Sequence, residues 1–370
     1  MRGRAGTLLM RPAWGMAVMY GSLDNLQKEA HIMKSIRNLL RTTLFGILVV
    51  VGLSHSDPEA ATLDASSHQK APATTPWRGP PGVKIEPSRR MRAEGYEWDH
   101  EIQIALPASY AKTSNAYPVL WVTDGAYWFE PAVNIVDFTD AEHLPEMIVI
   151  AVGAPPEAAN ETHTRRNFDF SPKSIGWEFS GFGSEPARVD RKKIEDRFMV
   201  SGELPAAKYG GAPAFLKFLI ETVRPALARD YRMADDNTLF GHSAGGTFCT
   251  YAFLARPDGF NKYVCGSPSL TWGDYELFRM EDTYARTHKD LAAKVFFGVG
   301  EAEILSGNSV GYPFVSSMTR MAEILKSRSY PSLQLHAEVF PGETHLPSAV
   351  ITLRRGLRVL WEGDAGKAAR

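Results

Sequence analysis

Cysteine is scarce in this sequence, and its scarcity excludes two classes of protein. Two cysteines in 370 residues cannot build a disulfide-rich scaffold, and Cys249 and Cys265 lack the paired spacing of a zinc site. Two alternatives remain: a pair of buried thiols, or one disulfide in an oxidising compartment. The sequence leaves this choice open, because the distance between the two Cα atoms decides whether a disulfide can form.

Net charge is almost absent as well. The chain has 41 basic and 42 acidic residues, and no basic block stands out in its body. A protein that binds a nucleic-acid backbone needs a concentration of positive charge. The sequence therefore predicts no nucleic-acid partner. Its hydrophobic content of 44% is typical of a globular protein with a full core.

Hydrophobic runs long enough to cross a membrane are also missing. The apolar run from Leu44 to Leu53 is about half the length of a spanning helix, which needs roughly 20 residues. Basic residues precede this run and small residues follow it, which is the layout of a secretory signal peptide. We expect residues 1–56 to be a leader, with Met33 as the true start. The mature protein would then be periplasmic or extracellular, with no stable membrane span after cleavage.

The remaining chain divides into a linker and one large domain. Residues 57–87 are rich in Pro, Ala, Ser and Thr and have too few apolar residues to fold alone. Residues 88–370 are predicted to form the domain. Within it, Gly, Pro, aromatic and charged residues interrupt the pattern at about 155–210. This insertion either shapes a pocket over the strand ends or is a surface excursion without function.

Short strand-like runs alternate with helical patterns through the domain. The strands are predicted at 97–107, 117–125, 146–153, 237–243, 262–269, 293–300 and 333–342, and the helices at 211–229, 244–255, 274–290, 314–328 and 346–361. Several strands are continuous apolar runs, as in parallel strands that are buried on both faces. The alternation predicts an α/β fold, with a mainly parallel, doubly wound sheet flanked by helices.

The strongest motif is a G-x-S-x-G sequence between a predicted strand and a predicted helix. It reads GHSAGG from Gly241 to Gly246, with Ser243 at its centre. This is the context of a nucleophile elbow, a strained turn that exposes the serine hydroxyl and leaves no room for larger neighbours. The alternative is an ordinary Gly-rich turn. The motif predicts Ser243 as a nucleophile in an α/β-hydrolase fold.

A base and an acid follow the serine in the chain order that this fold uses. His345 lies after the last predicted strand and before the last helix, where the base is expected. Glu301 and Glu303 follow the strand at 293–300, and either could orient the histidine. We favour Glu303 and keep Glu301 as the alternative. An exposed carboxylate in a loop is the other interpretation of each glutamate.

An oxyanion hole would need two backbone N–H groups near the serine. One is expected from Ala244, the residue after the nucleophile. The other is expected from Ala126, which follows the strand YPVLWVT and an Asp-Gly pair. A plain turn is the alternative interpretation of that pair.

These motifs resemble the putative esterase family of α/β hydrolases, which includes enterochelin and related siderophore esterases and feruloyl esterase domains. The resemblance spans about Glu97 to Trp361 and rests on YPVLWVTDG, GGAPAFLKFLIETVRPAL, GHSAGGTFCTYAFLARPDGFNKYVCGSPSLTW, FFGVGEAE and GETH. It implies an α/β-hydrolase fold, ester hydrolysis through an acyl-enzyme, and no cofactor. It also implies the roles predicted above for Ser243, His345 and Glu303.

The resemblance adds two candidate substrate-binding residues. Trp272, in SPSLTW, would lie near the pocket, although a core aromatic is the alternative. Arg166, in RRNFDFSP, falls where family members often carry an RxRDxTP-like segment that helps bind substrate. The present sequence departs from that pattern, because Asn167 and Phe168 intervene before Asp169.

The sequence thus predicts an exported serine esterase that acts on a small-molecule ester, such as a siderophore or feruloyl ester. No metal is implied, because no ligand cluster of suitable spacing accompanies the motif. Two alternatives remain. The same triad could transfer the acyl group to an alcohol instead of water, or the fold could bind a ligand without catalysis.

Overall fold

The computed structural model describes residues 77–139, 144–172, 209–304 and 313–362. The predicted leader and most of the predicted linker lie outside these ranges. The first strand begins at Lys84, inside the segment that we expected to be linker. Within the described residues, no helix combines the length and apolar character that crossing a bilayer requires.

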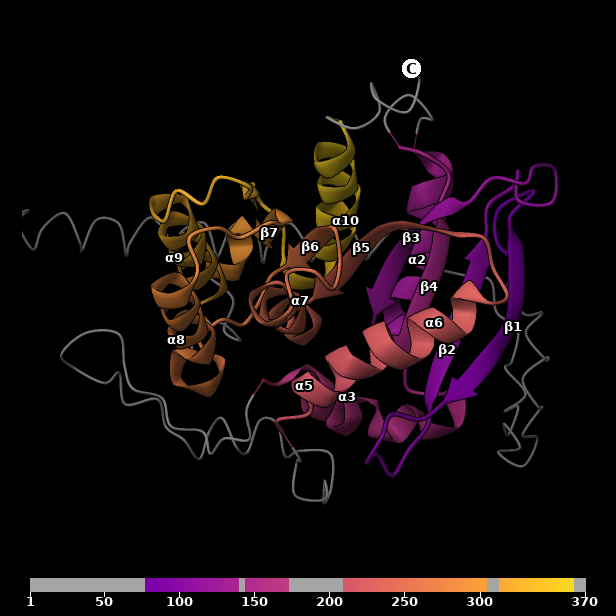
Figure 1. Cartoon of the computed structure of the whole chain (residues 1–370), viewed down its shortest axis with the longest axis horizontal. Helices are drawn as coiled ribbons and strands as arrows, with labels where there is room; N and C mark the ends of the chain where they lie inside the picture. The colour runs from indigo at the N-terminus through magenta and orange to yellow at the C-terminus, as the bar shows by residue number, and fades with distance from the viewer. Residues whose placement is uncertain (1–76, 140–143, 173–208, 305–312, 363–370) are drawn as a thin grey trace, which may run out of the picture. The chain divides into compact units, whose positions relative to one another are not determined.

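Eight strands form one sheet in the order β1-β2-β4-β3-β5-β6-β7-β8 (Figure 1). Their bounds are β1 Lys84–Met91, β2 His100–Leu106, β3 Tyr117–Thr123, β4 Ile148–Gly153, β5 Met233–His242, β6 Lys262–Gly266, β7 Lys294–Gly300 and β8 Gln334–Phe340. Only the pairings β1–β2 and β2–β4 are antiparallel. Every pairing from β4 to β8 is parallel, as the alternating pattern predicted.

Helices connect the strands. The α-helices are α2 Gly125–Phe138, α3 Thr162–Phe170, α5 Ala212–Lys217, α6 Arg224–Ala228, α7 Ala244–Ala255, α8 Trp272–Thr287, α9 Phe314–Ser327 and α10 His345–Trp361. A π-helical segment, η2 Phe218–Val223, joins α5 to α6, and two short 3₁₀ segments are η1 Pro156–Glu161 and η3 Glu301–Ile304.

The sheet has a hydrophobic core on each face. Side chains of α2 and α10 pack on one face, whereas those of α5, α7, α8 and α9 pack on the other. Strand β3 serves both cores, because successive side chains of a strand point to opposite faces. Val119 and Trp121 belong to one core, and Leu120 and Val122 to the other. This two-sided burial explains why the central strands are continuous apolar runs and confirms the predicted fold class.

Among the described strands and α-helices, three were not predicted. Strand β1 reads KIEPSRRM, a polar edge strand with a proline, and its sequence gives no apolar alternation. Helix α2 contains Pro131 and α3 lies within the irregular insertion. All seven predicted strands are present as β2 to β8. The predicted helices correspond to the α5–η2–α6 segment and to α7, α8, α9 and α10.

The strand order places the ends of β3 and β5 at a topological switch point. The chain moves from β3 to β4 on one side and then returns to β5 on the other. In open α/β sheets a crevice forms outside the carboxyl ends of the strands at such a point, and ligands bind there. The predicted triad and oxyanion residues follow the carboxyl ends of β3, β5, β7 and β8.

A disulfide joins Cys249 of α7 to Cys265 of β6. Both residues are fully buried, and their Cα atoms are 5.5 Å apart. The bond connects the helix that follows Ser243 to the neighbouring strand. The sequence left open whether these cysteines are buried thiols or a disulfide, and the structure has the disulfide.

Candidate active site

Ser243 forms a sharp turn between β5 and α7, with φ of 60° and ψ of −119°. A residue with a side chain rarely has positive φ, so this backbone is strained. The neighbouring glycines make the turn possible. A Cβ on Gly241 would lie 2.1 Å from the carbonyl oxygen of Gly245, and one on Gly246 would lie 2.2 Å from that of Gly266. The structure thus has the close packing that a nucleophile elbow requires.

His345 is the first residue of α10 and lies beside this turn. Its ring centroid is 4.7 Å from that of His242, the residue before Ser243, and 4.8 Å from that of Phe314. Its Nδ1 is 2.7 Å from Oε2 of Glu303. A hydrogen on Nδ1 that is donated to this carboxylate leaves the lone pair on Nε2, which is the tautomer that a general base needs.

Glu303 is only 1% exposed, yet its charge is well compensated. Its Oε2 accepts from His345, and its Oε1 accepts from the Ser267 hydroxyl at 2.7 Å and the Gly300 N–H at 2.8 Å. Burial alone would raise the pKa of Glu303. The hydrogen bonds from His345, Ser267 and Gly300 outweigh burial and hold that pKa below its usual value. Glu303 is therefore ionised at neutral pH.

Glu301 occupies a different environment, although it is only two residues away. Its side chain is exposed and accepts a hydrogen bond from the Gly342 N–H at 2.9 Å. Of the two acids that the sequence proposed, Glu303 is the one whose carboxylate is hydrogen-bonded to His345.

His242 is buried, and its ring packs against the ring of His345. Burial lowers the pKa of His242 well below 6.5, and electrostatic interactions with His345 and Arg166 act in the same direction. The ring of Trp128 packs edge-on against it, with the centroids 5.6 Å apart. His242 is therefore neutral under ordinary conditions and adds no charge to the site.

Two helix N-termini meet next to Ser243. Ala126 lies in the first turn of α2 and Ala244 in the first turn of α7, where backbone N–H groups have no partner within the helix. A Cβ on Gly245 would lie 2.5 Å from Oγ1 of Thr123 and 3.4 Å from Oδ2 of Asp124. This contact places the start of α7 against the end of β3. Both predicted oxyanion donors thus lie at N-termini that favour negative charge.

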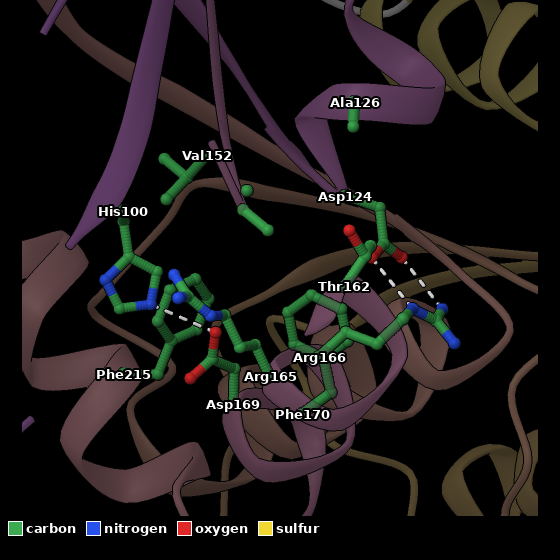
Figure 2. Close-up of a pocket in the computed structure, with 12 residues that line it drawn as sticks. His100, Asp124, Ala126, Val152, Thr162, Arg165, Arg166, Asp169, Phe170 and Phe215 are labelled. Carbon is green, nitrogen blue, oxygen red and sulfur yellow. Dashed lines mark hydrogen bonds and ion pairs between the residues drawn. The ribbon is translucent and has the colours of Figure 1, made fainter. Parts of the chain in front are cut away.

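Asp124 sets the start of α2 and is held by Arg166. Its backbone has φ of 55° and ψ of 50°, a left-handed conformation that Asp tolerates better than most residues. Arg166 donates from Nε to Oδ1 at 2.9 Å and from Nη2 to Oδ2 at 2.8 Å (Figure 2). The nearby negative charge of Asp124 outweighs burial and raises the pKa of Arg166. Sequence analysis proposed Arg166 for substrate binding; in the structure two of its nitrogens are bound to Asp124.

A small pocket lies on this side of the site, between the start of α2 and helix α3. Figure 2 shows its lining, which includes Asp124, Ala126 and Arg166. A second buried pair closes the pocket, because His100 Nε2 and Asp169 Oδ2 are 3.0 Å apart. Burial raises the pKa of Asp169 despite this hydrogen bond. The described part of the predicted insertion therefore contributes α3 to the walls of the site.

Trp272 begins helix α8, beyond the carboxyl end of β6. Its ring centroid is 5.2 Å from that of Tyr209. The same motif, SPSLTW, begins with Ser267, which sequence analysis missed. The Ser267 hydroxyl donates a hydrogen bond to the carboxylate of Glu303. Ser348 was missed too, and its hydroxyl lies 3.2 Å from Oε1 of Glu303. Neither serine shows a sequence signal of its own, because both contacts join segments far apart in the chain.

Known proteins resemble this chain in sequence and in structure. A family model described as "Putative esterase" matches residues 188–348. The ferri-bacillibactin esterase BesA of Bacillus subtilis is 24% identical over 289 residues, which are 77% of this chain and 91% of that protein. The siderophore triacetylfusarinine C esterase of Aspergillus fumigatus is 25% identical over 51% of this chain and 57% of that protein.

The fold also resembles a solved structure. The siderophore hydrolase EstB of Aspergillus nidulans superimposes with a TM-score of 0.60 at 21% identity, over 77% of this chain and 96% of that one. The matched sequence model covers the elbow, the loop that carries Glu303, and His345. The chain therefore resembles the putative esterase family and has the fold of an α/β hydrolase, and these similarities support an ester-hydrolysing enzyme.

Proposed function

We propose that this protein is a serine esterase that hydrolyses its substrate through an acyl-enzyme. His345 takes the proton of the Ser243 hydroxyl, and the oxygen attacks the ester carbonyl. The N–H groups of Ala126 and Ala244 stabilise the oxyanion that forms. The alcohol leaves with the proton from His345. Water, activated by the same histidine, then releases the acid and restores the serine.

One observation carries this proposal: the hydrogen bond between His345 and Glu303 beside a strained turn at Ser243. The 2.7 Å contact orients the imidazole, and the buried, ionised carboxylate stabilises the imidazolium that forms during catalysis. A binding protein would have no need for a strained serine next to a histidine that is hydrogen-bonded to a buried carboxylate.

The substrate class comes from the relatives. The proteins from Bacillus subtilis and Aspergillus fumigatus are named for two different siderophores, bacillibactin and triacetylfusarinine C. We infer that the present protein acts on an ester bond of a siderophore. The names agree on this class but not on one compound, so the specific siderophore is a matter for screening.

We also propose that the protein is exported. The predicted signal peptide supports export, although it lies outside the described residues. The disulfide between Cys249 and Cys265 gives independent support, because stable disulfides are characteristic of oxidising compartments.

The first test is labelling with a fluorophosphonate, which reacts with activated serines. Intact-protein mass spectrometry should show one adduct on the mature protein and none on Ser243→Ala. Ser269→Ala, which changes another serine near the site, is the matched control and should label like the wild type. Folded wild-type protein that gives no adduct would rule out the acyl-enzyme mechanism. Untreated wild-type protein would then be assayed for release of the free acid from siderophore esters.

A further inference from the structure

We propose that Ser267 is a positioning residue that holds Glu303 in place and stabilises its negative charge, and so sets the pH range in which His345 acts as base. This inference rests on the proposed function, because it assigns a role within the same triad. It gives the SPSLTW motif a function at Ser267, which is the first residue after strand β6.

The hydroxyl of Ser267 has two neighbouring oxygen atoms, and one of them is clearly the better acceptor for its hydrogen. Its Oγ lies 2.7 Å from Oε1 of Glu303 and 3.2 Å from Oγ of Ser348. A carboxylate only accepts hydrogen bonds, and a bond to an ionised group is stronger than one between neutral groups. Ser267 is fully buried, so water does not compete for this contact. The hydrogen of Ser267 is therefore donated to Glu303.

Ser348 makes a weaker contribution. Its Oγ lies 2.8 Å from the carbonyl oxygen of His345, in the preceding turn of α10, and 3.2 Å from Oε1 of Glu303. A serine has a single hydrogen to donate, and the shorter contact takes it. Ser267 is thus the main side chain, apart from His345, that compensates the buried carboxylate.

The backbone at Ser267 shows that this position is held against strain. Its φ is 37°, which is unfavourable for a residue with a side chain. Its N–H donates to the carbonyl oxygen of Gly298 at 2.7 Å and so fixes the loop to β7. Glycine would relieve the strain at this position but would lose the hydroxyl. Strained residues persist where the surrounding structure holds them, and they cluster at functional sites.

The hydroxyl has a predictable effect on the pH dependence. It stabilises the carboxylate most when His345 is neutral, because a protonated imidazole already compensates part of the charge. Without the hydroxyl, the Glu303–His345 pair takes up its proton at higher pH. Among the described residues, the ring of His242 packs against that of His345 and is neutral, and Arg166, whose charge acts on His242, is paired with Asp124. Neither touches Ser267 in a hydrogen bond or ion pair of the described chain.

The experiment compares Ser267→Ala with two other serine variants. Steady-state kinetics on a soluble ester should show kcat reduced on the order of tenfold with KM unchanged, because the hydroxyl does not touch the substrate. The acid limb of kcat/KM should move to higher pH by roughly half a unit. Ser348→Ala should give a smaller change in both. Ser269→Ala is the matched control, because its buried hydroxyl has no hydrogen-bond partner among the described residues.

A second variant separates the hydroxyl from the backbone. Ser267→Gly removes the same hydroxyl and relieves the positive φ, so it should fold and show the same shift of the acid limb. If both variants keep the wild-type pH profile and kcat, the proposal is wrong. NMR titration of the Glu303 carboxyl group tests it without any turnover, since the pKa of Glu303 should rise in Ser267→Gly when this hydrogen bond is lost. Failure of the wild type to react with fluorophosphonate would instead refute the esterase mechanism, while the titration still decides the role of Ser267.

Discussion

The two sides of the candidate site are built from different kinds of interaction. On the acid side, one buried carboxylate, Glu303, is surrounded by neutral hydroxyl and backbone donors and by His345. On the oxyanion side, Asp124 is compensated by a full opposite charge on Arg166. A carboxylate that must respond to a proton on its histidine cannot also be tied to a permanent cation. The comparison therefore indicates which side titrates during catalysis and which side is a fixed scaffold.

The largest expected effect comes from removing the charge on the acid side. Glu303→Gln should lower kcat on the order of a thousandfold or more, because an amide favours the wrong histidine tautomer and cannot stabilise the imidazolium. Steady-state kinetics on a soluble ester measures this. Glu301→Gln is the matched control two residues away, and its kcat should stay within about threefold of the wild type. Equal losses in the two variants would contradict the assignment of the acid to Glu303.

Removing the cation on the oxyanion side should affect stability as well as rate. Arg166→Met leaves Asp124, which is 4% exposed, without its partner and should cost about 3–5 kcal/mol of unfolding free energy. Loss of order at the start of α2 should also lower kcat by roughly tenfold to a hundredfold. Chemical denaturation and kinetics on the same sample measure both effects.

Arg286→Met is the control for this variant. Arg286 pairs with Asp282 on the surface, where the two side chains are 76% and 48% exposed, and such a pair contributes little, about 0.2–1 kcal/mol. Adding Asp124→Asn to Arg166→Met should restore part of the stability, because the unpaired charge is then removed. If the double variant is no more stable than Arg166→Met, the bidentate pair does not account for the loss.

The smallest effect concerns His242, which lies between the two sides. Its pKa in the folded protein is well below 6.5, so the unfolded chain binds a proton at a higher pH than the folded protein does. Above pH 6.5, His242 is neutral in both states and does not lower the unfolding free energy. As the pH falls below 6.5, the unfolded chain takes up a proton on this histidine, and the unfolding free energy decreases by up to about 1.4 kcal/mol per pH unit. Denaturation at a series of pH values should therefore show a shallower slope for His242→Gln. His288→Gln, which changes an exposed histidine, is the control variant.

The acid side was largely predictable from sequence because its main residues follow strands that were easy to recognise. The strand-like sequences before Ser243, Glu303 and His345 identified three parallel strands, and parallel strands bring their carboxyl ends to one edge. The glycine-rich turn marked the serine. Ser267 and Ser348 escaped notice, since a serine near a strand end or in a helix is common and only its partner shows its role.

The oxyanion side was less predictable. Sequence analysis located Ala126 from the Asp-Gly pair, but helix α2 itself was not predicted. It proposed Arg166 for substrate binding but did not identify Asp124 as its partner, because 42 residues separate the two in the sequence. The pair of His100 and Asp169 was not anticipated, because it joins the start of β2 to the irregular insertion. Charged side chains carry no periodic signal from which such long-range pairs could be inferred.

The sequence by itself determined the fold class, the position of the elbow and the order of serine, acid and histidine. It could do so because strand burial, glycine conformation and connection rules act locally or follow from strand order. Only the tertiary structure decided that Glu303 rather than Glu301 is bonded to His345, that the two cysteines are joined, and that Arg166 is bound to Asp124. These outcomes depend on distances and directions between side chains, which the packed sheet and helices fix and no local pattern encodes.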